Sequence, residues 1–175
     1  VFGEVAGWER ANWFAREGQE REYRYSWHRQ NWFENQKAEH LAVRNGVGLF
    51  DMTSFGKIRV EGHDACAFLQ HLCANDVDVP AGKIVYTQML NARGGIESDL
   101  TVLRRSRDEF FIVTGSSQAT RDFAWIERHI GRDEHAALVD VTGAWCVLSI
   151  MGPNAEPLLA SLSRDDFSRA AIPFS

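Results

Sequence analysis

The chain holds 175 residues, a length that fits one ordinary domain or one domain with an appended arm. Its 45% hydrophobic and 25% charged residues are typical of a globular protein with a closed apolar core, and its net charge of -5 gives no electrostatic support to a nucleic-acid partner. No apolar run approaches the roughly 20 residues that a membrane-spanning helix needs, so we expect no membrane partner.

Residues 1–30 differ in composition from the rest, because aromatic and arginine side chains are interleaved there without a regular period. We therefore predict no helix or strand in this arm. Aromatic side chains at this density favour an arm that packs on another domain. Acidic residues among the arginines argue against the alternative, a site for single-stranded nucleic acid. The aromatic residues are Trp8, Trp13, Phe14, Tyr23, Tyr25 and Trp27.

From Asn31 onward the chain shows regular periods. Helical spacing and a stop at Asn45-Gly46 predict a helix over 31–44, and a short apolar step over 47–50 follows. The later elements are a strand over 56–60, a helix from 65 to about the Asn75-Asp76 pair, strands over 84–90, 96–103 and 109–114, a helix from Gly115-Ser116-Ser117 to about 130, a strand pair over 138–141 and 145–150, and a short helix opened by Gly152-Pro153-Asn154. This order predicts an α+β domain with a mainly antiparallel sheet and helices packed on it.

His63, Cys66, His71 and Cys73 lie close in sequence and raise the question of a metal site. Both cysteines accompany the apolar stripe of the predicted helix, whereas His71 points to another side, so we interpret them as packing residues and expect no metal. The chain has no dinucleotide-binding glycine motif, no phosphate-binding loop and no serine-nucleophile motif.

The three cysteines, the third being Cys146, cannot all pair with one another. No signal-peptide pattern precedes them, so we expect a reducing compartment: the cytoplasm, or the mitochondrial matrix in a eukaryote. A start at Val1-Phe2-Gly3 is typical of an excised or processed piece.

The most informative stretch is the strand predicted after the turn at 91–95. A carboxylate such as Asp99 is among the residues least favoured inside a strand. Two interpretations stay open: Asp99 lies on a solvated strand face, or it stands beside a pocket and accepts a proton from a bound amine. Gly94-Gly95 likewise permits either a hairpin turn or the close approach of a ligand. Alternation places Ile96, Ser98, Leu100 and Val102 on one face and Glu97, Asp99 and Thr101 on the other.

Several separated motifs carry a family resemblance. The stretch 86–102 resembles the signature of the glycine-cleavage aminomethyltransferase family, and most closely its variant in sarcosine and dimethylglycine dehydrogenases and oxidases. The arm motif over 7–14 is similar to the segment that precedes this domain in the flavin-linked members. Further matches follow in the right order over 48–57, 60–65, 68–70, 75–77 and 150–155.

The resemblance implies a mechanism. A flavin domain oxidises an N-methyl amine to an iminium, and tetrahydrofolate captures the iminium carbon to give 5,10-methylenetetrahydrofolate. The family's catalytic carboxylate falls on Asp99, which orients the N10 region of the folate and acts as a base toward the attacking nitrogen. Ser98-Asp99 is the flavin-linked pattern, since glycine-cleavage members usually carry two consecutive acids there. Met52, Tyr86 and Val102 match positions that line the folate pocket, where aromatic and thioether groups suit a pterin or aminobenzoyl ring.

The implied organisation is a linker arm over 1–30 and the N-terminal part of the folate-binding domain over 31–175. FAD would lie in a preceding flavin domain, so the expected partners are that domain, the remainder of the folate domain, tetrahydrofolate and the iminium. The fragment alone is expected to be inactive. Two alternatives stay open: a non-catalytic scaffold module with this fold, and a flavin-independent folate-linked demethylase or aminomethyltransferase. The retained Asp99 and the arm motif argue against the scaffold module, and the arm motif alone argues against the flavin-independent enzyme.

Overall fold

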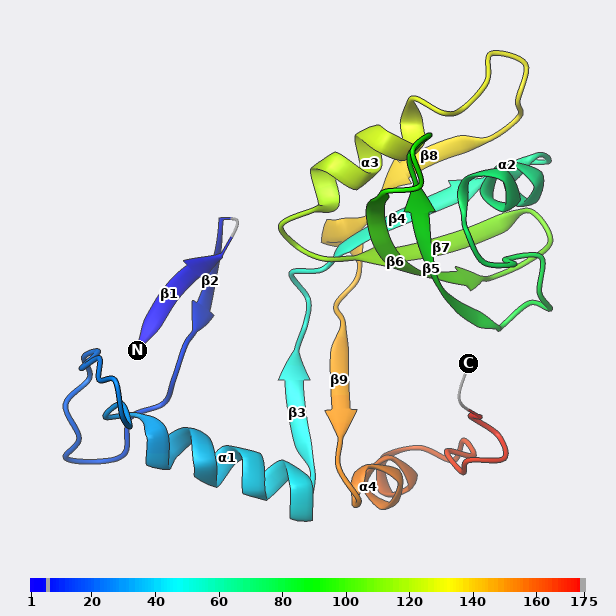
Figure 1. Ribbon diagram of the computed structural model, residues 1–175. Coiled ribbons are helices and arrows are strands. Elements are labelled where there is room, and N and C mark those ends of the chain that lie inside the picture. Colours follow the sequence, from blue (N-terminus) through cyan, green and yellow to red (C-terminus); the bar gives the residue numbers. More distant parts are fainter. Residues whose placement is uncertain (6, 174–175) are drawn as a thin grey trace. The chain divides into compact units, whose positions relative to one another are not determined.

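The computed structural model describes residues 1–5 and 7–173, and the chain divides into two compact units. One unit holds Val1–Asp51 together with the segment that begins at Leu148, and the other holds Met52–Val147. Figure 1 shows the helices and strands of both.

The Met52–Val147 unit is built on an antiparallel sheet of five strands in the order β5-β6-β7-β4-β8. Strands β5 and β6 form the predicted hairpin, and the predicted α+β class with a mainly antiparallel sheet is confirmed (Figure 1). In chain order the elements are β4 (Gly56–Glu61), α2 (Ala65–Leu72), β5 (Ile84–Leu90), β6 (Ile96–Arg104), β7 (Glu109–Thr114), α3 (Ala119–Glu127), β8 (Ala137–Asp140) and the 3-10 helix η1 (Thr142–Ala144).

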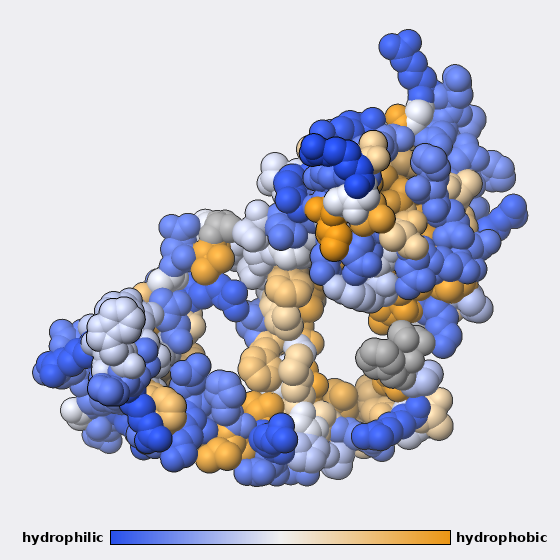
Figure 2. Space-filling model, viewed as in Figure 1, coloured by the Kyte–Doolittle hydropathy of each residue, from blue (hydrophilic) through white to orange (hydrophobic). Residues whose placement is uncertain are grey.

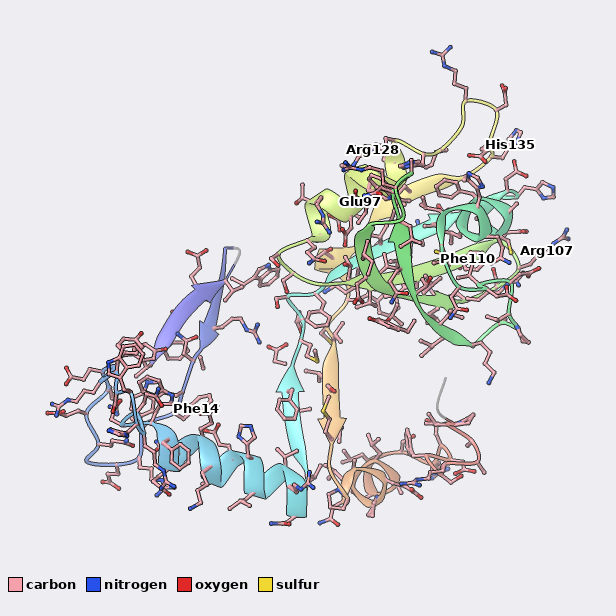
Figure 3. The ribbon with its side chains drawn as sticks, in the orientation of Figure 1. Phe14, Glu97, Arg107, Phe110, Arg128 and His135 are labelled. Atoms are coloured by element: carbon pink, nitrogen blue, oxygen red, sulfur yellow. The ribbon has the colours of Figure 1, made fainter. Side chains whose placement is uncertain are left out.

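Helices α2 and α3 cover the same face of this sheet. Phe68 of α2 and Ile126 of α3 belong to one buried cluster with Phe110 and Ile112 of β7, and Figure 3 shows Phe110 on its strand. Burial of each such side chain contributes about 1.5–3 kcal/mol. Because successive side chains of a strand point to opposite faces, the residues between the buried ones lie on the face of the sheet that α2 and α3 do not cover. We call it the open face; in the β5-β6 hairpin it carries Tyr86, Gln88, Asp99 and Thr101.

The other unit begins with a hairpin of β1 (Phe2–Val5) and β2 (Trp8–Ala11). Helix α1 (Phe33–Asn45) follows, β3 (Gly48–Asp51) pairs antiparallel with β9 (Leu148–Met151), and α4 (Ala155–Leu162) comes last. The α1 and α4 predictions are confirmed.

Aromatic residues of the arm pack partly on one another. Tyr23 and Tyr25 are stacked, and both meet the ring of Trp32 edge-on, at 5.1 and 5.6 Å between centroids. Trp13 is buried, whereas Trp27 is fully exposed. The predicted packing of this arm on another domain, and the domain boundary at residue 30, stay predictions.

The prediction of no strand in the arm is wrong, because Phe2–Val5 and Trp8–Ala11 form a hairpin. Seven of its eight residues are exposed, so no apolar face imposed an alternating pattern that the sequence could reveal. Gly7 lies in the turn with φ 82°, a left-handed conformation that suits glycine.

The predicted pairing of 138–141 with 145–150 is also wrong. Strand β8 pairs with β4, and β9 pairs with β3, the segment interpreted as a short apolar step. Periodicity identifies a strand, but its partner is chosen by contacts between residues about a hundred positions apart, which local patterns do not encode. Helix α2 ends earlier than predicted, at Leu72, because Cys73 is already extended and forms a bridge with Met89.

Candidate functional site

Asp99 lies on β6 and is exposed on the open face, while its neighbours Ser98 and Leu100 are buried. The predicted alternation is confirmed from Ser98 to Val102. It fails at Ile96, which is 67% exposed. The cause is a bulge: Met89 pairs with Ser98 but Leu90 pairs with Ile96, so Glu97 is an extra residue. A bulge shifts the direction of side chains around it, and here it lies two residues from Asp99.

Tyr86 is joined directly to Asp99. Its phenol oxygen donates a hydrogen bond of 2.6 Å to Oδ2 of the carboxylate. Tyr86 is paired with Thr101 in the sheet and Asp99 with Gln88, so the two are diagonal neighbours across the hairpin, within reach of a long side chain. The hydrogen bond to Asp99, with a smaller contribution from burial, raises the pKa of Tyr86 and keeps the phenol a donor at neutral pH.

The turn beside the site is held by Asn91. Its side-chain Oδ1 accepts from the backbone N–H groups of Arg93 and Gly95 at 2.9 and 3.0 Å, and its Nδ2 donates to Glu97 at 2.8 Å. Gly94 has φ 77°, so the turn itself requires glycine there. Glu97 lies at the hairpin end of β6, as Figure 3 shows, and the Arg121 guanidinium of α3 donates to its backbone carbonyl. The register that sets Asp99 opposite Gln88 is therefore fixed at the turn.

Met52 lies in the loop before β4 and is half-buried. Its N–H donates to the Val147 carbonyl at 2.8 Å, and its carbonyl accepts from Phe55 at 3.0 Å. The next residue is held by a fully buried lysine, since Lys57 Nζ donates to the carbonyls of Thr53 at 2.7 Å and Trp145 at 2.9 Å. The backbone at Met52 is thus fixed on both sides.

Val102 is separated from the other predicted site residues. It is 1% exposed and belongs to the buried cluster beneath α2 and α3, whereas Tyr86 and Asp99 are on the open face. Val102 therefore packs in the core, on the face of β6 opposite to Asp99. Its side chain does not reach the open face, so a ligand bound beside Asp99 would not touch the Val102 side chain there.

Two residues near the site were missed by the sequence analysis. Gln88 faces Asp99 across the hairpin, and its side chain lies close enough to the Tyr86 phenol to oppose the rise in its pKa. Its position two residues after Tyr86 in a predicted strand was the available signal. Lys57 is the second, and its complete burial could not be read from a strand whose alternation suggests an exposed lysine.

The open face also exposes apolar surface on β5. Ile84 is 48% exposed, Tyr86 57% and Leu90 43%, all at alternate positions of the strand. Figure 2 shows hydrophobic residues interrupting the hydrophilic surface of the chain. Exposed large side chains in a row beside a carboxylate are a feature of ligand or partner surfaces.

Within residues 1–5 and 7–173, no group of three or more His, Cys, Asp and Glu side chains is arranged to hold a metal ion. Cys73 belongs to the buried cluster and Cys66 packs against it, so the interpretation of both as packing residues is confirmed. Among the same residues, no helix combines the length and apolar character that crossing a bilayer requires.

The chain is similar in sequence to a known domain family and to several enzymes. The sequence pattern of the GCVT N-terminal domain matches residues 1–175. The chain is 43% identical over 170 residues to a 4-methylaminobutanoate oxidase (formaldehyde-forming) of Paenarthrobacter nicotinovorans, a match that covers 97% of this chain and 20% of that protein. It is 36% identical over 170 residues to the mitochondrial dimethylglycine dehydrogenase of Mus musculus, covering 97% of this chain and 19% of the relative. The chain thus spans about a fifth of the length of these relatives.

A solved structure supports the fold. The crystal structure of the glycine cleavage system aminomethyltransferase T from Bartonella henselae superposes with a TM-score of 0.68 at 26% sequence identity. The match covers 92% of this chain and 39% of that one.

Proposed function

Because the chain belongs to the family of GCVT N-terminal domains, we propose that it is the folate-binding part of a flavin-dependent N-methyl amine dehydrogenase or oxidase. In that enzyme it transfers the oxidised one-carbon unit to tetrahydrofolate. Relatives named as an oxidase and a dehydrogenase support the enzyme class. The aminomethyltransferase fold supports the one-carbon transfer.

The observation that carries the proposal is the hydrogen bond between Tyr86 and Asp99 on the open face. Two residues to which the family resemblance assigns different roles are brought into contact by the fold, at an exposed surface. A carboxylate with a protonated phenol on one oxygen keeps its second oxygen as an acceptor for an N–H group. Catalysis by a positioned base requires this kind of group within hydrogen-bond reach of the nitrogen that loses its proton.

The side chains present fit tetrahydrofolate in their chemistry. The exposed ring of Tyr86 and the exposed apolar groups of Ile84 and Leu90 suit a flat, partly apolar ring system. Asp99 suits the folate's N–H groups. When bound, tetrahydrofolate supplies the nucleophilic nitrogens that take the one-carbon unit. Asp99 then orients the N10 region and accepts the proton released as the nitrogen bonds to carbon, while Tyr86 holds the carboxylate.

FAD belongs, in this proposal, to a part of the enzyme outside these 175 residues. When bound there, FAD would supply the two-electron oxidation of the N-methyl amine to an iminium. The iminium carbon then becomes the methylene group of 5,10-methylenetetrahydrofolate as the demethylated amine is released. The preceding flavin domain and the remainder of the folate domain are the expected partners, and a reducing compartment is the expected location.

The test uses the full-length protein with Asp99→Asn and, as a matched control, Asp133→Asn at an exposed loop carboxylate. Flavin reduction is followed anaerobically with dimethylglycine, sarcosine and 4-methylaminobutanoate, and products are divided into 5,10-methylenetetrahydrofolate and free formaldehyde. We expect Asp99→Asn to keep flavin reduction and to lower the folate product roughly tenfold or more, with formaldehyde in its place, because one positioned base contributes about 10²–10⁴-fold.

Two outcomes would contradict the proposal. An unchanged product ratio in Asp99→Asn would make Asp99 a solvated strand residue and favour a non-catalytic scaffold. A full-length protein without flavin that still forms the folate product would favour the flavin-independent demethylase or aminomethyltransferase.

A further inference from the structure

We propose that the hydroxyl of Tyr86, and not only its ring, serves the transfer: it fixes the Asp99 carboxylate by occupying Oδ2 and leaves Oδ1 as the oxygen that faces the ligand. This inference rests on the proposed function and assigns Tyr86 a positioning role within the same site. Lining a pocket requires only the ring of Tyr86, whereas this role requires its oxygen.

The geometry is that of a charge-assisted hydrogen bond. The distance of 2.6 Å between the phenol oxygen and Oδ2 falls in the range of about 2.5–2.7 Å for an O–H donor on an ionised carboxylate. The same hydrogen bond is the main cause of the raised pKa of Tyr86, so the phenol is the donor of the pair. Such bonds are roughly twice as strong as those between neutral groups, and they are directional.

Asp99 needs a partner of this kind because the sheet does not fix it. It is exposed on the open face, and Tyr86 is the side chain that donates to its carboxylate among the described residues. A free aspartate rotates about its last torsion, so both oxygens sample many directions. A base that must meet one nitrogen gains rate from a fixed direction, since orientation is a major part of enzymatic rate enhancement.

Tyr86 is itself well placed to act as a fixed donor. Its strand is held to β6 by a register that continues from Ile84 opposite Leu103 to Met89 opposite Ser98. Gln88, two residues later, faces Asp99 directly across the hairpin. The donor, the carboxylate and this amide therefore come from one continuously paired stretch of the hairpin rather than from loops.

The experiment compares Tyr86→Phe, Asp99→Asn and the double variant in the full-length enzyme, with Tyr25→Phe in the arm as the matched control. Tyr25 is 79% exposed, and the change removes only its hydroxyl. Rates of 5,10-methylenetetrahydrofolate formation are measured against tetrahydrofolate concentration, to separate kcat from KM. Flavin content and flavin reduction by the amine confirm that each variant is folded and supplies the iminium.

We expect Tyr86→Phe to lower kcat for the folate product roughly five- to twentyfold with little change in KM, because the ring stays and the charge-assisted hydrogen bond is lost. In the Asp99→Asn background the same change should add less than about twofold, because residues that act as a unit are not additive. Tyr86→Leu should raise KM as well, since it removes the ring.

An unchanged kcat in Tyr86→Phe would overturn the inference, and so would an equal loss in both backgrounds. Failure of the inference differs from failure of the proposed function. If Asp99→Asn diverts the product to formaldehyde while Tyr86→Phe changes nothing, only the role of the hydroxyl is wrong. If Asp99→Asn itself changes nothing, the folate site is wrong.

Discussion

Replacing Lys57 by methionine tests how the loop that carries Met52 is held. Lys57 is 0% exposed, and its Nζ donates to the backbone carbonyls of Thr53 and Trp145. Hydrogen bonds that involve a charged group contribute about 1.5–3 kcal/mol each, so the loss of two costs about 3–6 kcal/mol. The similar length of methionine retains most of the apolar contacts, and the lower value, about 3 kcal/mol, is the one we expect.

Amide hydrogen exchange followed by mass spectrometry on the full-length protein reports this change locally, peptide by peptide. A loss of about 3 kcal/mol corresponds to exchange faster by roughly 100-fold in peptides that cover 52–60 and 141–147. The amides of Met52 and Val141, which donate to Val147 and Lys57, are the informative ones. Lys83→Met, at an exposed lysine, should change exchange by less than about threefold. Equal protection in the Lys57 and Lys83 variants would refute this account of the loop.

Two further predictions concern titratable groups. Burial raises the pKa of the Cys73 thiol to about 12, so iodoacetamide at pH 8 should label the exposed Cys146 and leave Cys73 unmodified until the protein is denatured, as peptide mapping would show. Hydrogen bonds from the Thr142 hydroxyl and backbone N–H lower the pKa of Asp140, so its folded value lies below its unfolded one. That contribution to stability is present above the ordinary aspartate pKa of about 4 and is lost as the pH falls through the folded value. Asp140→Ala should therefore lower the melting temperature at pH 7, and this effect should shrink as the pH falls below about 4. An effect that does not change over this range would contradict the assignment.

The local features of the site could be predicted from the sequence. Alternation along β6 predicted that Ser98, Leu100 and Val102 share one face and that Asp99 lies on the other; the structure buries the first three and exposes Asp99. The glycine-rich turn after Asn91 predicted the hairpin, because few residues adopt the left-handed conformation of Gly94. Both depend on interactions within a few residues, which is the range over which a sequence pattern is informative.

Which strands and side chains distant in sequence lie together could not be predicted and is seen in the folded chain alone. The sequence indicated two strands near residues 140 and 150 but not that they pair with β4 and β3, since each pairing closes a loop that no local preference encodes. The burial of Lys57 depends on carbonyls 4 and 88 residues away. The contact between Tyr86 and Asp99 belongs to the same class: alternation places each on a face, but the hairpin register makes them diagonal neighbours, and only that register brings the phenol to the carboxylate.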